Sequence, residues 1–119
     1  MKQIPLIAFV TLVASAATAE PPEIVDATAT QTGTSWRVDV TLRHPDTGWA
    51  HYADGWDVRD EAGTRLGHRV LHHPHVDEQP FTRALVDLDL QDVTGDIFVR
   101  AHCSVDGWTT DTVRIHIQP

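Results

Sequence analysis

The chain has 119 residues, 41% of them hydrophobic and 22% charged, which is the composition of one small folded domain. This length excludes a multidomain enzyme. Asp and Glu number 17 against 9 Lys and Arg, so the formal net charge is −8. Such a surface repels phosphate groups, and we therefore expect neither nucleic acid nor an anionic membrane as a partner.

The first nineteen residues have the pattern of a signal peptide. Lys2 precedes an apolar run from Ile4 to Val13, and Ala17-Thr18-Ala19 resembles a cleavage site of small residues. The run is about half of the roughly 20 apolar residues that a membrane-spanning helix requires, so insertion is not expected. We predict a signal peptide over 1–19, a single domain over 20–119, and a periplasmic or secreted mature protein.

The mature part alternates apolar and polar residues with the period of β-strands, between turns rich in Gly, Pro, Asp and Thr. The predicted strands are Glu23 to Thr30, Trp36 to Arg43, Gly55 to Arg59, Thr64 to Leu71, Thr82 to Leu90, Ile97 to Cys103 and Thr112 to Ile117. Seven short strands in about 100 residues are typical of an immunoglobulin-like or fibronectin-like sandwich. The predicted fold is therefore an all-β, seven-stranded antiparallel sandwich.

Side chains of the same parity along each strand supply the predicted core. Trp36, Val38, Val40 and Leu42 share one face, as do Ala84, Val86, Leu88 and Leu90, then Ile97, Val99, Ala101 and Cys103, and finally Val113, Ile115 and Ile117. Trp56 follows the same pattern with Val58. Cys103, the single cysteine, has no partner for an internal disulfide.

Antiparallel strands place every second connection at the same end of a sandwich. The connections 44–54, 72–81 and 103–110 are then neighbours at one pole, and they are long and rich in histidine. Six of the eight His residues lie on or beside this pole with Cys103, namely His44, His51, His72, His73, His75 and His102. Loops on a rigid scaffold often carry function, so this pole is the candidate site.

Neutral imidazole and thiolate are common ligands of iron, copper and zinc. The candidate metal ligands are His44, His51, Cys103, Asp106, His73, His75 and His102. The acidic side chains Asp54, Asp77, Glu78 and Asp106 could complete a metal shell or orient a ligand His. The spacing also fits a structural interpretation, in which Cys103 belongs to the core and the histidines lie on the surface.

A different function is suggested by the aromatic residues of the same pole. Trp49, Tyr52 and Trp108, with Arg83 nearby, could stack on a small ligand or dock another exported protein, and such a module needs no metal. The two Trp side chains could equally close the end of the sandwich. His102 and Cys103 are adjacent in a strand and point to opposite faces, so we predict no Cys-His catalytic pair.

The order His44-Pro45, His51-Tyr52 and Cys103-Ser104-Val105-Asp106-Gly107 resembles superoxide reductases of the desulfoferrodoxin type. That family has an immunoglobulin-like sandwich with iron held at one pole by four His and one Cys. The resemblance covers roughly residues 44 to 108 and implies that His44, His51 and Cys103 stand at ligand positions. Asp106 occupies the position of a ligand His, residues 20–43 contain no His, and the mature chain has no Lys, so the resemblance is to a divergent member with an incomplete ligand set.

These observations lead to one expectation and one alternative. The first is an exported sandwich that binds iron, copper or zinc at its His-rich pole and serves in metal handling or a redox role. The alternative is a noncatalytic docking module of the periplasm, without metal.

Overall fold

The computed structural model describes residues 3, 5 and 20–117 of the chain. The predicted signal peptide, residues 1–19, lies outside the described residues except for Gln3 and Pro5. None of the described residues forms a helix long and apolar enough to cross a lipid bilayer.

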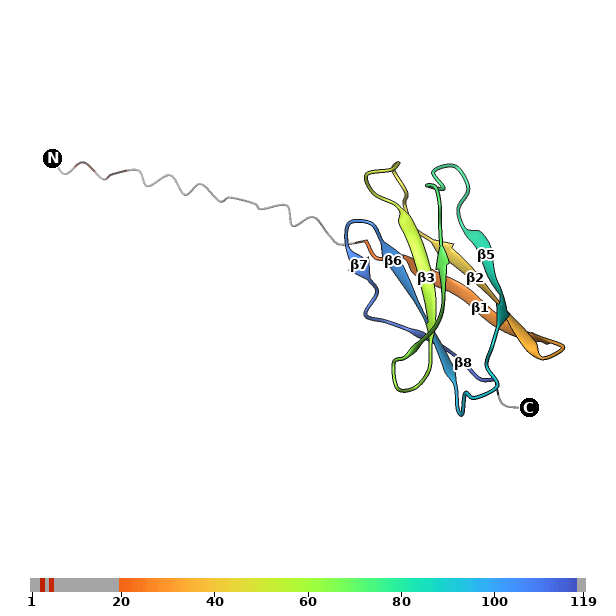
Figure 1. Cartoon of the computed structure of the whole chain (residues 1–119). Helices are drawn as coiled ribbons and strands as arrows, with labels where there is room; N and C mark the ends of the chain where they lie inside the picture. The colour runs from red at the N-terminus through yellow and green to blue at the C-terminus, as the bar shows by residue number, and fades with distance from the viewer. Residues whose placement is uncertain (1–2, 4, 6–19, 118–119) are drawn as a thin grey trace.

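Two antiparallel sheets pack face to face (Figure 1). The three-stranded sheet has the order β1 (Glu23–Thr32), β2 (Ser35–Arg43) and β5 (Phe81–Leu88). The five-stranded sheet has the order β4 (Arg65–Val70), β3 (Ala53–Arg59), β6 (Ile97–Cys103) and β7 (Gly107–Trp108), and β8 (Val113–Ile115) also pairs with β6. The predicted all-β antiparallel sandwich is confirmed.

The described residues form eight strands, where the sequence pattern predicts seven. The additional strand, β7, has two residues and pairs with the end of β6 through His102 with Trp108 and Cys103 with Gly107. Gly107 has a φ of +80°, which an L side chain adopts at a cost, and it lets the chain turn back beside β6. Trp108 was predicted in a loop and lies in this short strand.

The core consists mainly of the predicted inward faces. Val38, Val40, Leu42, Trp56, Val58, Ile97, Val99, Ala101 and Cys103 are buried between the sheets. Trp36 and Ile117 pack against this cluster from its edges. Alternation along β2 and β6 therefore predicted which side chains the sandwich buries, since hydrophobic burial is the dominant stabilising contribution.

The prediction for β5 is wrong at Ala84, which pairs with Asp39 on the outer face, and at Val86, whose exposed fraction is 54%. Val38 pairs with Leu85 and Trp36 with Leu88. A step of two residues along β2 thus lies opposite a step of three residues along β5, and β5 bulges. Asp87, at the bulge, has a φ of +56°. The bulge shifts the alternation by one residue, and Leu85 packs against the core in place of Val86.

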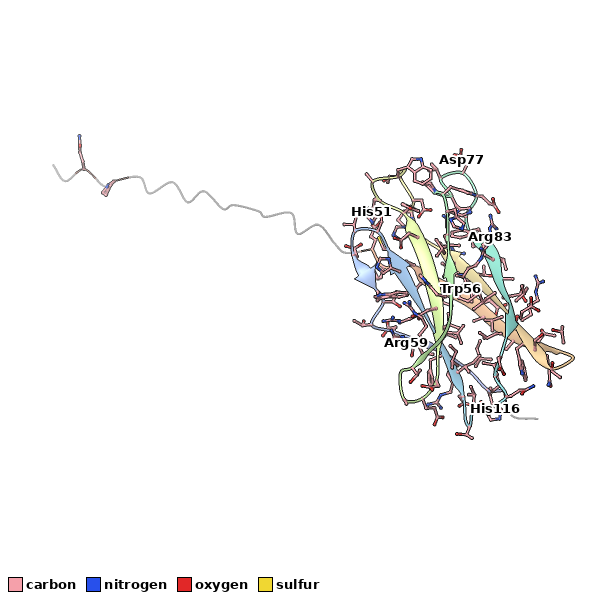
Figure 2. The ribbon with its side chains drawn as sticks, viewed as in Figure 1. His51, Trp56, Arg59, Asp77, Arg83 and His116 are labelled. Atoms are coloured by element: carbon pink, nitrogen blue, oxygen red, sulfur yellow. The ribbon has the colours of Figure 1, made fainter. Side chains whose placement is uncertain are left out.

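Three connections meet at one end of the sandwich, and we call residues 44–52, 71–80 and 103–107 the histidine pole. Backbone and side-chain hydrogen bonds join them: Ser104 N donates to Tyr52 O (2.9 Å), and His75 N donates to Asp46 Oδ2 (2.8 Å). Figure 2 shows Asp77 and His51 toward this end and His116 at the opposite end. The connections named by strand parity are thus spatial neighbours.

Candidate metal centre

His44 follows β2 directly and is fully buried at the histidine pole. Its Nδ1 donates to Oδ1 of Asp46 at 2.6 Å, and both side chains are inaccessible to solvent. In the neutral imidazole this hydrogen bond places the proton on Nδ1 and the lone pair on Nε2, and Nε2 has no hydrogen-bond partner among the described residues. His44 therefore presents a lone pair inside the protein with nothing to receive it.

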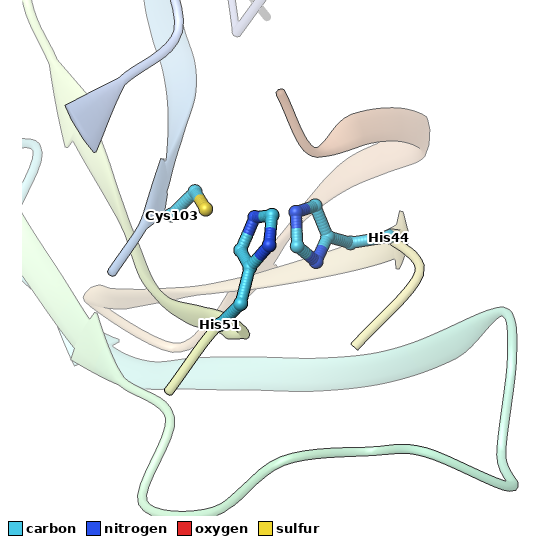
Figure 3. A group of neighbouring side chains, drawn as sticks. All are labelled: His44, His51 and Cys103. Atoms are coloured by element: carbon cyan, nitrogen blue, oxygen red, sulfur yellow. The ribbon is translucent and has the colours of Figure 1, made fainter. Parts of the chain in front are cut away.

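His51 and Cys103 lie beside that nitrogen (Figure 3). One ligand atom from each of His44, His51 and Cys103 lies within 4.8 Å of the other two. The two imidazole rings meet edge to face, with centroids 5.0 Å apart. Cys103 is buried and pairs across the sheet with Ala53, which places its thiol at the end of the core beside His51 (Figure 3).

Asp106 lies at the open side of this group. Its Oδ2 is 3.6 Å from His51 Nε2 and 3.7 Å from Cys103 Sγ. Ligand atoms of a tetrahedral zinc site are roughly 3.3–3.8 Å apart, given metal–ligand bonds of about 2.0–2.3 Å. The carboxylate therefore lies at ligand-like separation from the imidazole of His51 and from the thiol of Cys103, which donates a hydrogen bond to it, but it lies outside the group of mutually close ligand atoms formed by His44, His51 and Cys103.

Asp46 organises the pole around His44. Besides the imidazole, its two oxygens accept hydrogen bonds from Ala53 N (2.9 Å) and His75 N (2.8 Å). Gln79 adds a second link, because its Oε1 accepts from His44 N and its Nε2 donates to His75 O. Because one buried carboxylate binds all three groups, it holds His44 in a fixed position relative to the chain segments that contain Ala53 and His75.

Comparison with known proteins identifies a similar fold but no family. No family model matches the chain. The chain is 38% identical over 86 residues to a Halomicrobium mukohataei protein whose name is "Putative lipoprotein", covering 71% of this chain and 42% of the relative. The chain therefore spans less than half the length of that relative.

The sandwich is also similar to a solved structure. A crystal structure of a hypothetical protein from Pyrococcus horikoshii superposes with a TM-score of 0.57 at 12% sequence identity, covering 82% of this chain and 90% of that one. At this identity the similarity concerns the fold alone, since unrelated functions share a sandwich of this kind.

His73 and His75, two further predicted ligands, lie on the neighbouring loop of the pole. His75 is buried, stacks on Phe81 with centroids 3.8 Å apart, and accepts a hydrogen bond from Arg83 Nη2 at 2.9 Å. Burial, and then the charge of Arg83, lowers the pKa of His75. The Nε2 of this histidine is thus already engaged by the predicted docking residue Arg83, while His73 packs against its ring.

His102, the seventh predicted ligand, lies on the other face of β6 from Cys103. Its Nδ1 hydrogen-bonds to Asp54, and its ring meets Trp108 edge to face at 4.7 Å. Trp108, one of the predicted docking residues, is half-buried on this outer face of the sheet. Trp49 is exposed and packs edge to face on Tyr52, 5.7 Å between centroids.

Asp46 and Gln79 were missed by the sequence analysis. One signal was available for Asp46: an acidic residue two positions after a candidate ligand His is near enough to hydrogen-bond to that His. The carboxylate's other partners are backbone N–H groups at residues 53 and 75, which no residue pattern reveals.

Proposed function

We propose that the histidine pole binds a transition metal ion through His44 Nε2, His51, and the Cys103 thiolate, with Asp106 as the fourth ligand. The observation that supports this most directly is the convergence of the three ligand atoms within 4.8 Å, together with two buried imidazole nitrogens, His44 Nε2 and His51 Nε2, that have no hydrogen-bond partner among the described residues. A buried, unpaired nitrogen is costly, and a metal ion would satisfy it.

Two His, one Cys and one Asp form a mixed nitrogen, sulfur and oxygen donor set that suits zinc, iron or copper. His73, His75 and His102 are not ligands in this proposal. Each has a hydrogen-bond partner in the fold: His73 Nδ1 bonds to Pro74 O, His75 Nε2 to Arg83, and His102 Nδ1 to Asp54. The proposed role is metal handling or a redox function in an exported protein.

Export is part of the proposal. The Lys2-to-Ala19 pattern supports it, as does the similarity to a relative named as a lipoprotein. The resemblance to superoxide reductases supports iron as the first metal to test. Asp106, where that family has a His, argues for altered chemistry at the metal, because a carboxylate is a harder ligand than imidazole.

The experiment is elemental analysis of purified residues 20–119 after incubation with iron, copper or zinc. We expect one metal ion per chain, and loss of that metal in the His51→Ala and Cys103→Ser variants. His73→Ala, a change of the same kind on the neighbouring loop, is the control and should bind as the native protein does. Full metal binding by both site variants would refute the assignment.

A docking module is the second candidate, and the exposed apolar side chains of the pole favour it. Trp49 is 68% exposed, and Val76 and Val105 are exposed on the two other loops of the pole. Large exposed apolar side chains often mark interaction sites. A protein that binds no metal but loses a pull-down partner on Trp49→Ser substitution would establish this function instead.

A further inference from the structure

The outer face of the five-stranded sheet carries a second buried carboxylate, Asp57, whose side chain is 0% exposed. Three arginines surround it. Arg100 donates from Nε to Oδ1 (2.9 Å) and from Nη2 to Oδ2 (2.9 Å), Arg65 donates from Nε (3.0 Å), and Arg59 donates from Nε (3.3 Å). These side chains come from β6, β4 and β3, so the cluster extends across three neighbouring strands (Figure 2 labels Arg59).

The cluster has a surplus of positive charge. Burial acts to raise the pKa of Asp57, but hydrogen bonds from Arg100 and Arg65 outweigh it and lower that pKa, so the carboxylate is ionised. One negative charge then faces three guanidinium groups. Partial burial, and then the charge of Arg65, also lowers the pKa of the nearby His68. This concentration of positive charge stands out in a chain whose net charge is −8.

Within the described part of the chain, Arg65 is the arginine of this cluster whose outer nitrogens remain free. Arg65 uses Nε for the carboxylate, and its two Nη groups have no hydrogen-bond partner among the described residues. The Arg65 side chain is 42% exposed and that of Arg100 is 16% exposed. Guanidinium N–H groups match the geometry of carboxylate and phosphate oxygens, often in pairs.

Trp108 forms an aromatic wall beside these donors. Its ring centroid is 3.8 Å from Cζ of Arg100 and 5.3 Å from Cζ of Arg65. The indole shields the ion pairs from water on one side, and a lower local dielectric strengthens the attraction between a guanidinium group and an anion. His68 and His102 contact the same ring and border the cluster.

We propose that the free Nη groups of Arg65, with Arg100 and Trp108 beside them, bind an oxyanion, the phosphate or carboxylate group of a small external ligand. Asp57 holds Arg65 in place through its Nε atom and leaves the two Nη groups of Arg65 to the ligand, while Arg100 and Arg59 use outer nitrogens for Asp57 Oδ2 and Gly63 O. The site lies on the outer face of the sheet, opposite to the face from which Cys103 enters the core, and it does not depend on a metal.

The experiment is a titration of residues 20–119 with inorganic phosphate, followed by isothermal calorimetry and by NMR of the Trp108 indole N–H. The protein is first stripped of metal with a chelator and then dialysed, so that phosphate cannot bind through a metal ion. Succinate is the second arm, and sodium chloride at matched ionic strength is the control for screening. Tighter binding of phosphate identifies a phosphate ligand, and tighter binding of succinate identifies a carboxylate ligand.

We expect saturable binding that shifts the Trp108 resonance, and at least about tenfold weaker binding in Arg65→Gln, because a hydrogen bond to a charged group is lost. Arg114→Gln is the matched control: Arg114 lies on the same sheet face over Phe98 and outside the cluster. Equal binding by the two variants, or a response to phosphate that chloride reproduces, would overturn the proposal. Circular dichroism of both variants verifies that each is folded.

Discussion

Two buried carboxylates, Asp46 and Asp57, organise two regions of this sandwich in opposite ways. Asp46 accepts hydrogen bonds from two backbone N–H groups and one imidazole at the histidine pole. Asp57, on the outer face of β3, accepts hydrogen bonds from three arginines of β3, β4 and β6. Both side chains are inaccessible to solvent, and every oxygen has a partner.

The partners decide what each region can bind. The backbone and imidazole partners of Asp46 carry no fixed positive charge, so the pole keeps its negative charge and a free imidazole nitrogen, which suit a cation. The guanidinium partners of Asp57 more than neutralise it, so the outer face keeps positive charge, which suits an anion. A buried carboxylate can thus prepare a site for a ligand of either sign, depending on which donors surround it.

The largest expected effect is on stability at Asp57. Asp57→Asn removes the negative charge that pairs with three guanidinium groups, and breaking a buried ion pair costs about 3–5 kcal/mol. Arg59 and Arg65 can turn to water, so we expect about 3 kcal/mol, the lower end of that range. Urea unfolding monitored by tryptophan fluorescence measures this loss.

Asp39→Asn is the matched control for that prediction. Asp39 is paired with Arg37 on the outer face of β2, where both side chains are partly exposed. The free energy of unfolding should change by no more than about 1 kcal/mol, as is usual for surface ion pairs. Similar losses at both positions would show that the three arginines do not depend on Asp57.

A smaller effect is expected on metal affinity at Asp46. Asp46→Asn removes the carboxylate that orients His44, and such changes weaken metal binding by about 10–100-fold. Asp54→Asn is the control, since Asp54 pairs with His102 on the other face of the sheet. Competition with a chelator of known affinity measures both. If both variants bind as the native protein does, Asp46 has a structural role alone.

The fold could be predicted from alternation because one face of each strand is buried. The exceptions are local: the bulge at Val86 continues an apolar pattern without a break, so only the pairing with β2 reveals it. The strand β7 consists of Gly107 and Trp108, and two residues are too few to show a period. Patterns over several residues therefore predict strands, whereas single-residue irregularities depend on the partner strand.

The candidate site was partly predictable for a related reason. Strand parity placed His44, His51 and Cys103 at one pole, because topology fixes which loops meet. It could not show which imidazole atoms are free, since that depends on Asp46 and Arg83 from other segments. The cluster around Asp57 was not predicted at all, because its arginines are spread over three strands and have the ordinary appearance of outward-facing charges.

The smallest expected effect is on the pH dependence of the unfolding free energy, to which the two regions contribute at different pH. The pKa of His75 is lowered by burial and by Arg83, so the unfolded chain takes up a proton first and stability falls as pH drops below about 6.5, the ordinary value for His. The lowered pKa of Asp57 stabilises the fold above about pH 4, and this contribution is lost as pH falls further. Each group adds a slope of at most about 1.4 kcal/mol per pH unit. The test is the unfolding free energy measured from pH 8 to 3. In His75→Gln the fall in stability below about pH 6.5 should disappear, and in Asp57→Asn the fall below about pH 4 should disappear. A native-like pH profile in either variant would mean that the group it replaces does not cause that fall.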